Sequence, residues 1–116
     1  MKIKRWQYCN VTEYYELDIT NETLKEYKEL LQKYAVNPEI VPDITYDMIK
    51  DAMNGDYAEE DNIVIHCKRT HYDGSPWEYD EYLYDWLRDV VNEDVWDSYS
   101  EQVDSDSYDD ETEIED

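Results

Sequence analysis

Positive charge is scarce in this sequence: ten Lys and Arg stand against 32 Asp and Glu, so the net charge is −22 over 116 residues. Proteins bind nucleic acids and anionic membranes through Lys and Arg, so direct binding to either is disfavoured. No apolar run approaches the roughly 20 residues of a membrane span, and the polar residues after Met1 do not resemble a signal peptide. We therefore expect a cytoplasmic protein.

Phenylalanine is absent, whereas tyrosine occurs 13 times and tryptophan four times. Tyr can replace Phe in a core, but Tyr and Trp also dominate the anchors of protein interfaces, because each joins an apolar ring to a polar group. Thirteen tyrosines are too many for one small core, so we expect several on the surface. Cysteine is scarce too, and we expect Cys9 and Cys67 to remain thiols in an intracellular protein.

The sequence also lacks the signatures of common active sites. Its two glycines form no phosphate-binding loop, and no Ser-His-Asp or Cys-His arrangement has a recognisable local pattern. A carboxylate pair for acid–base catalysis needs one member whose pKa is raised by burial beside one left ionised, whereas we expect the acids here to be exposed. We expect a protein that is not an enzyme and has no cofactor.

A calcium-binding loop is incomplete in the last part of the chain. Asp104, Asp106 and Glu115 occupy positions 1, 3 and 12 of an EF-hand-like pattern, but Tyr108 stands at position 5 and Asp109 replaces the turn glycine at position 6. We expect no specific metal site, and a Ca²⁺-binding module is the least favoured of the functions considered.

Hydrophobic periodicity predicts the first elements. Strand-prone residues, alternating with acids toward their end, predict a β-hairpin over residues 3–19 with its turn near Asn10. A helix is predicted from residue 20 or 21 to Pro38, and a strand near 63–70. Together with the helices described next, these elements predict an α+β fold, in which about three helices pack on a small antiparallel sheet made of the hairpin and this strand.

Two further helices are predicted from their end signals. Thr45 is a suitable N-cap, Ile44 and Ile49 have the spacing of a hydrophobic staple, and Gly55 is a C-terminal stop. The segment Ser75-Pro76-Trp77-Glu78 combines an N-cap, a proline at the first helical position and a capping-box glutamate. It predicts a helix that runs to about residue 92 and can extend through residue 96.

Acidic residues concentrate in the C-terminal part of the chain. Residues 73–116 hold 18 acids and one base, Arg88, for a net charge of −17, whereas residues 1–72 carry −5. We expect residues 1–100 to form a single domain and residues 101–116 to form a flexible acidic tail, because the tail has too few apolar residues to fold alone. The acids crowded into residues 73–116 repel one another, and this repulsion costs stability. We therefore expect a partner with a large positive surface.

Acids three or four residues apart would share one face of the last predicted helix, and the tail continues this charge. If the tail were helical, its nine acids would present one charge per roughly 2.7 Å, close to the 3.4 Å of a DNA strand. The residues expected to bind the partner are the acids Glu78, Asp80, Glu81, Asp85, Asp89, Glu93, Asp94, Asp97, Glu101, Asp104 and Asp106, and the aromatics Tyr82, Tyr84 and Trp96.

In size, isoelectric point near 4.1, aromatic content and charge placement, the chain resembles phage-encoded DNA-mimic inhibitors of the antirestriction and anti-CRISPR type. The resemblance covers just over a third of the chain and includes no motif, so no residue role follows by alignment. It implies an inhibitor that evades host defence, in the cytoplasm of the host cell, by occupying the basic groove of a nuclease or a restriction or CRISPR effector. The residues that carry it are Glu78, Glu81, Asp85, Asp89 and Asp97, with Tyr79, Tyr82, Tyr84 and Trp96.

A second hypothesis is an acidic chaperone or assembly factor that shields a basic protein without blocking catalysis. In that case the tail would do most of the binding, so removing the residues after Glu101 should abolish it. The inhibitor hypothesis instead predicts a larger loss when the helical acids Glu81, Asp85 and Asp89 are reversed in charge. The sequence leaves the oligomeric state open, a dimer included.

Overall fold

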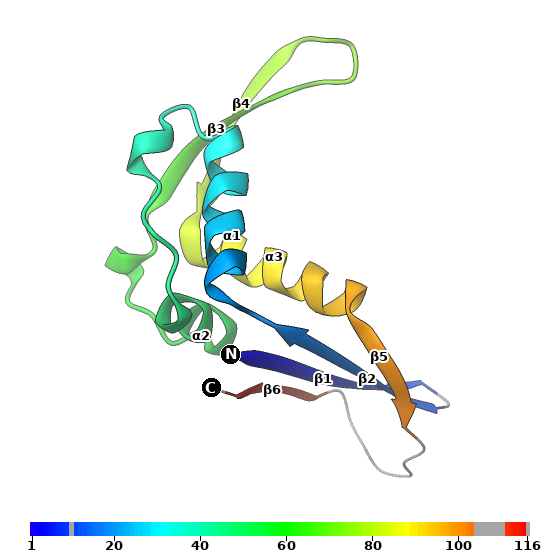
Figure 1. Ribbon diagram of the computed structural model, residues 1–116. Helices are drawn as coiled ribbons and strands as arrows, with labels where there is room; N and C mark the ends of the chain where they lie inside the picture. The colour runs from blue at the N-terminus through cyan, green and yellow to red at the C-terminus, as the bar shows by residue number, and fades with distance from the viewer. Residues whose placement is uncertain (10, 104–110, 116) are drawn as a thin grey trace. The chain divides into compact units, whose positions relative to one another are not determined.

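The computed structural model describes residues 1–9, 11–103 and 111–115 (Figure 1). Within these residues it has three α-helices and two antiparallel sheets, one of four strands and one of two, so the predicted α+β class is confirmed. The chain forms two compact units. The first comprises Met1–Thr20 and Val90–Asp116, and the second comprises Asn21–Asp89.

The first unit contains the four-stranded sheet, in the order β5-β2-β1-β6. Strands β1 (Lys2–Cys9) and β2 (Val11–Asp18) form the predicted hairpin, with Cys9 opposite Val11. Strand β5 (Tyr99–Val103) pairs with β2, and β6 (Glu111–Glu115) pairs with β1. We expected the folded domain to end near residue 100 and a tail to follow. Instead, β5 and β6 belong to the same sheet as the hairpin.

The pairing of β6 with β1 has a simple physical reason. Strand β1 carries three bases, whereas β6 alternates glutamates with Thr112 and Ile114. The register places Lys2 opposite Glu115 and Ile3 opposite Ile114, so opposite charges meet on one face and apolar side chains on the other. The apolar core of this unit consists of Ile3, Tyr15, Ile19, Val90, Val91 and Val95, all at most 9% exposed.

The second unit begins with two helices, α1 (Asn21–Tyr34) and α2 (Tyr46–Asn54). The predicted end signals of α2 are confirmed: the Thr45 hydroxyl accepts a hydrogen bond from the Met48 amide at 3.2 Å, and Gly55 takes a left-handed φ of 69°. Both residues of the staple, Ile44 and Ile49, are buried. Short 3₁₀ turns at Pro38–Ile40 and Glu59–Asp61 complete the connections.

The strand predicted near residues 63–70 forms as β3 (Val64–Thr70), but it does not join the N-terminal hairpin. It pairs with β4 (Pro76–Tyr82), and these two strands form a separate sheet. In the first sheet β1 lies between β2 and β6, and the outer side of β2 is taken by β5. The hairpin therefore has other partners along the edges that β3 would have needed.

The helix predicted to begin at Pro76 begins instead at Leu83, and α3 runs from Leu83 to Asp97. The residue expected to cap it, Ser75, closes a hairpin turn. Its carbonyl accepts from the His71 amide at 2.7 Å, and its hydroxyl donates to the Asp73 carboxylate at 2.6 Å. At the actual start of α3, the free Tyr84 amide finds its hydrogen-bond acceptor in the side chain of Asn62, at 2.8 Å.

The second unit has its own core, to which both helices, β3 and the start of α3 contribute. Its most deeply buried residues are Leu31, Ile49, Ala52, Ile65, Cys67, Leu83 and Leu87, each at most 2% exposed.

Within the parts of the chain that the structure describes, no helix combines the length and the apolar character needed to cross a bilayer.

Candidate functional site

The β3–β4 hairpin, residues 64–82, is the most distinctive surface of the second unit and is called the ribbon below. Its register pairs His66 with Asp80 and Lys68 with Glu78 on one face, here called the polar face. The opposite face is called the aromatic face. It carries the cross-strand pairs Ile65–Glu81, Cys67–Tyr79 and Arg69–Trp77.

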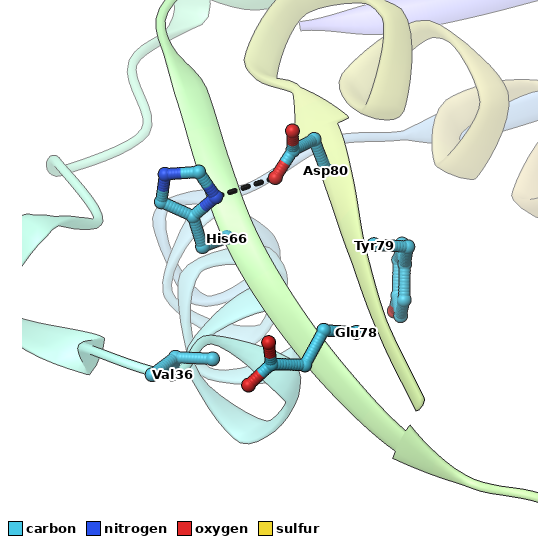
Figure 2. Close-up of a pocket in the computed structure, with 5 residues that line it drawn as sticks. All are labelled: Val36, His66, Glu78, Tyr79 and Asp80. Atoms are coloured by element: carbon cyan, nitrogen blue, oxygen red, sulfur yellow. Dashed lines mark hydrogen bonds and ion pairs between the residues drawn. The ribbon is translucent and has the colours of Figure 1, made fainter. Parts of the chain in front are cut away.

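The polar face borders a hollow of about 460 Å³ lined by Val36, His66, Glu78, Tyr79 and Asp80 (Figure 2). His66 Nδ1 is hydrogen-bonded to Asp80 Oδ1, and the Glu78 carboxylate lies on the same side of β4. The Tyr79 ring points to the other side of the strand. Two exposed carboxylates beside an apolar Val36 side chain suit the long apolar stem and charged end of a Lys or Arg side chain.

The aromatic face carries a continuous stack of side chains. The His71 and Trp77 rings lie 5.4 Å apart, and the Trp77 and Tyr79 rings 4.6 Å apart. Arg69 extends the stack: its guanidinium lies 4.4 Å from the centre of the Tyr34 ring, and its Nε donates to the Tyr79 hydroxyl at 2.7 Å. The ring contacts lie within the ribbon, and the cation–π contact between Arg69 and Tyr34 ties it to α1.

Exposed apolar side chains gather on and beside the ribbon. Of the nine large apolar side chains that are exposed among the described residues, five fall between residues 63 and 82. They are Ile63, Val64, Tyr72, Trp77 and Tyr82. Val64 and Tyr82 lie opposite one another on the polar face, whereas Trp77 lies on the aromatic face and Tyr72 in the turn. Exposed Tyr and Trp are typical of protein interfaces.

Helix α3 presents a second candidate surface, a line of carboxylates called the acidic row: Asp85, Asp89, Glu93 and Asp97. Steps of four residues place successive members on one side of the helix, about 6 Å apart along its axis. Asp85 accepts from the Tyr57 hydroxyl at 3.0 Å and from Arg88 at 3.2 Å. The other three are exposed, and none has a basic partner among the described residues.

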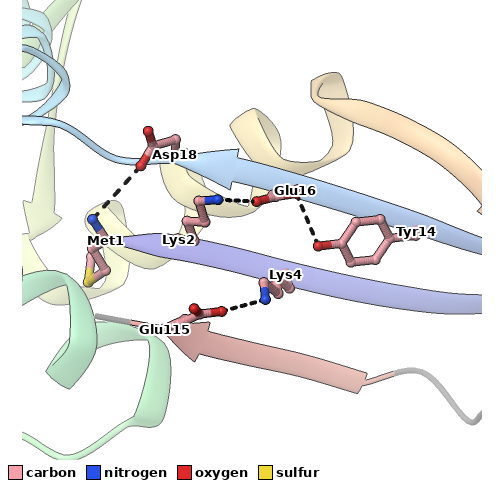
Figure 3. A network of polar contacts seen from close by, with 7 residues as sticks. All are labelled: Met1, Lys2, Lys4, Tyr14, Glu16, Asp18 and Glu115. Atoms are coloured by element: carbon pink, nitrogen blue, oxygen red, sulfur yellow. Dashed lines mark hydrogen bonds and ion pairs between the residues drawn. The ribbon is translucent and has the colours of Figure 1, made fainter.

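Several of the bases are engaged by acids of the scaffold. In the sheet, Lys2 forms an ion pair with Glu16 at 3.0 Å, and Lys4 forms one with Glu115 (Figure 3). Hydrogen bonds from these lysines lower the pKa of each glutamate. In the second unit, Lys28 likewise pairs with Asp43 at 2.6 Å. These bases neutralise acids that hold the fold, so they leave the acidic row uncompensated.

The acids predicted to share one face of a single helix lie on two different elements, β4 and α3. Glu78, Asp80 and Tyr82 lie on β4, where they are exposed on the polar face. Glu81 faces the other way and is half-buried. Burial raises the pKa of Glu81, Arg69 opposes this, and the charges of Asp89 and Asp85 add to the increase. Glu81 is therefore not an exposed contact for a partner.

The aromatic residues predicted to bind the partner differ in how far they are exposed. Tyr84 is 8% exposed and its ring stacks on Tyr57 at 4.6 Å, so it belongs to the core and cannot be an anchor. Trp96 is 43% exposed, but its ring packs edge-on against Tyr15 and lies under the Arg5 guanidinium. Of the predicted acids, Asp94 is half-buried. The Glu101 side chain, Asp104 and Asp106 lie outside the described residues.

Sequence reasoning missed His66, Trp77 and the hollow beside the ribbon. A signal was present, since aromatic and acidic residues alternate over residues 77–80 in the order Trp-Glu-Tyr-Asp, which is the period of a strand. The capping-box pattern Ser75-Pro76-Trp77-Glu78 overlaps this alternation and predicts a helix instead. The structure brings Glu78, Asp80 and Tyr82 together on the ribbon, and Asp85, Asp89, Glu93 and Asp97 together on α3.

No group of three or more His, Cys, Asp or Glu side chains in the described part of the chain is arranged to hold a metal ion. Four of the five EF-hand-like positions, Asp104, Asp106, Tyr108 and Asp109, lie outside it. The chain matches no protein-family model, no curated protein and no solved structure.

Proposed function

We propose that the protein is a non-enzymatic inhibitor that mimics nucleic acid and occupies the nucleic-acid groove of a basic protein, such as a nuclease or a defence effector. The observation that carries the proposal is the acidic row. Asp89, Glu93 and Asp97 are exposed and evenly spaced on one helix, and the only base on that helix, Arg88, is bonded to Asp85. A regular line of uncompensated carboxylates can replace phosphates against Lys and Arg.

The two surfaces have complementary roles in this proposal. Long-range attraction between the net charge of −22 and a cationic groove speeds association, and the acidic row then pairs with individual bases. The exposed Trp77 and Tyr82 of the ribbon supply apolar contact, which screening by salt does not remove. Ion pairs alone would give a weak complex, because an exposed pair contributes only about 0.2–1 kcal/mol.

The test is to neutralise the row without changing its shape. A triple variant, Asp89→Asn, Glu93→Gln and Asp97→Asn, is compared with a control that loses three exposed acids elsewhere: Glu39→Gln, Glu59→Gln and Glu60→Gln. The partner is captured from host lysate with the unaltered chain, and its affinity for both variants is measured. At about 0.5 kcal/mol per pair, the row variant should bind about tenfold more weakly than the control.

Two further readouts separate nucleic-acid mimicry from general stickiness. Duplex DNA should compete with the protein for the partner, and affinity should fall steeply as salt rises. Equal binding by the row variant and the control would contradict the proposal. So would a complex that persists unchanged in about 0.5 M salt, where exposed charges are screened within a few ångströms.

A further inference from the structure

The ribbon has one edge whose main-chain groups point away from the hairpin. In an antiparallel pair, residues alternate between those bonded to the neighbouring strand and those whose N–H and C=O point outward. The His66 carbonyl accepts from the Val36 amide at 2.8 Å, on the side away from β4. In their main chains, His66 and its cross-strand partner Asp80 therefore form a non-hydrogen-bonded pair. The N–H and C=O groups of both residues point away from the other strand of the ribbon.

The same alternation assigns the rest of β4. Glu78, Asp80 and Tyr82 direct their N–H and C=O groups to the outer edge. The bonds that close the ribbon fit this phase, since Leu83 donates to Ile63 at 2.9 Å and His71 to Ser75 at 2.7 Å. The two-stranded sheet consists of β3 and β4 only, so within the described residues no strand pairs with that outer edge.

The two edges of the ribbon are not equivalent. The outer edge of β3 is covered near its middle by a bridge between Ala35 and Cys67 and by the Val36 bond. The outer edge of β4 has no such cover among the described residues, and the side chains of Glu78, Asp80 and Tyr82 are all exposed. An uncovered strand edge of this kind is a template for a further strand.

We propose that β4 binds an extended segment of the cationic partner as a third, antiparallel strand of the ribbon. Lys or Arg side chains of that segment lie opposite Glu78 and Asp80 on the polar face, and apolar side chains lie opposite Trp77 and Tyr79 on the aromatic face. This inference rests on the proposed function, because the bound segment belongs to the same basic protein. It adds the kind of segment that is recognised, one that alternates basic and apolar residues.

Charge selects this occupant over a second copy of the chain. Two β4 edges paired with one another would bring Glu78 and Asp80 close to the same residues of the other copy, and like charges directly opposite destabilise a sheet. Pro76, which has no N–H, stands at the start of the same edge. Proline and charge are the usual protection against self-pairing, and a strand rich in Lys and Arg turns the charge into an attraction.

The edge is also held ready for binding. A two-stranded hairpin alone is only marginally stable, but the stack from His71 to Arg69 and the bridge to Ala35 fix this one to α1. The turn is fixed too, because Asp73 accepts from both the amide and the hydroxyl of Ser75. A strand that is already extended loses little conformational entropy when a partner strand adds to it.

The test uses the full chain, labelled with ¹⁵N, and a synthetic peptide of about nine residues that alternates Lys and Val. A control peptide has the same side chains but N-methyl groups on every second residue, which removes the donors that would face β4. The unmodified peptide should protect the amides of Glu78, Asp80 and Tyr82 from hydrogen exchange. Losing two or three main-chain bonds should weaken binding at least about tenfold.

Side chains are tested with Glu78→Gln and Asp80→Asn together, against Glu59→Gln and Glu60→Gln as a matched control. Only the first pair should weaken peptide binding. Equal affinity for the two peptides would mean attraction by charge alone and would overturn the inference. Protection of the same amides without peptide, rising with protein concentration, would mean pairing of two copies and would overturn it as well.

The peptide experiment also separates this inference from the proposed function. Failure of the peptide to bind, while the basic protein from lysate binds and responds to the acidic-row variant, would remove the third-strand inference and leave the inhibitor proposal standing. The reverse result, a peptide that adds to β4 when the acidic-row variant binds the basic protein normally, would keep the inference and reject nucleic-acid mimicry by α3.

Discussion

The guanidinium of Arg5 lies 5.3 Å from the centre of the Trp96 ring. The same guanidinium donates from Nε to the Thr112 hydroxyl at 3.2 Å and from Nη2 to the Asn92 side chain. One base thus joins β1, β6 and the end of α3. In a protein with so few cations, this position shows that Arg5 serves the fold.

Replacing Arg5 by Lys should therefore destabilise the protein although the charge is kept. Lysine cannot donate to two separate acceptors while lying flat on an indole ring. We expect a loss of about 1–2 kcal/mol in the free energy of unfolding, measured by chemical denaturation. Lys2→Arg is the control, since its ion pair with Glu16 can be kept. Equal stability of Arg5→Lys and the unaltered protein would contradict this role.

Glu81 should reduce stability at neutral pH, so Glu81→Gln should raise the melting temperature. Burial raises the pKa of this carboxyl from 4.5, which means that its charged form is disfavoured in the folded state. The penalty is absent below the unfolded pKa, where both states are protonated, and grows as pH rises toward the raised folded value. The advantage of Glu81→Gln should accordingly be present at pH 7 and disappear near pH 4. An advantage independent of pH would point to packing instead.

Acid should weaken the pairing of β6 with the sheet. Lys4 lowers the pKa of Glu115, and Lys2 lowers that of Glu16. Such carboxylates contribute stability above their unfolded pKa of about 4.5, and this contribution is lost as pH falls through the lowered folded values. Met1 and Ile19 exchange main-chain hydrogen bonds, so the odd-numbered residues of β1 bond to β2 and Lys4 faces Glu113 of β6. The protection of the Lys4 and Glu113 amides against hydrogen exchange, corrected for the intrinsic effect of pH on exchange, should fall below that range. Lys4→Gln should show a smaller dependence on pH.

Gly74→Ala should destabilise the ribbon through the backbone alone. Gly74 has φ of 91°, and a Cβ at this position would meet no atom within 4 Å. The cost is therefore conformational, about 1–2 kcal/mol for an L-residue at positive φ. Gly74→Asn should cost less, since Asn tolerates positive φ better than Ala. Chemical denaturation measures both, and equal losses would indicate another cause.

Neutralising the tail separates the inhibitor from the acidic chaperone. Asp104, Asp106, Asp109 and Asp110 can be replaced by Asn without removing β5 or β6 from the chain. The inhibitor proposal predicts that this variant binds the captured partner better than the acidic-row variant does. Stronger loss from the tail than from the row, measured as affinity at one salt concentration, would favour the chaperone.

Local signals in the sequence predicted the parts of the fold that depend on neighbours along the chain. Thr45, Ile44 and Gly55 act within one or two turns of α2, so the predicted helix formed with the predicted ends. The N-terminal hairpin also formed, because its strands are adjacent in sequence and alternate in polarity. The excess of acid over base is a property of composition and needs no structure.

Only the tertiary structure decided the state of residues 76–82. A helix N-cap contributes about 1 kcal/mol, whereas β3 needed a partner along its whole length, and seven cross-strand pairs outweigh one cap. The consequence for the surface follows from periodicity. A helix would place Glu78 and Glu81 on one side, but a strand alternates, so Glu78 is exposed on the polar face and Glu81 turns toward Arg69 and the buried side.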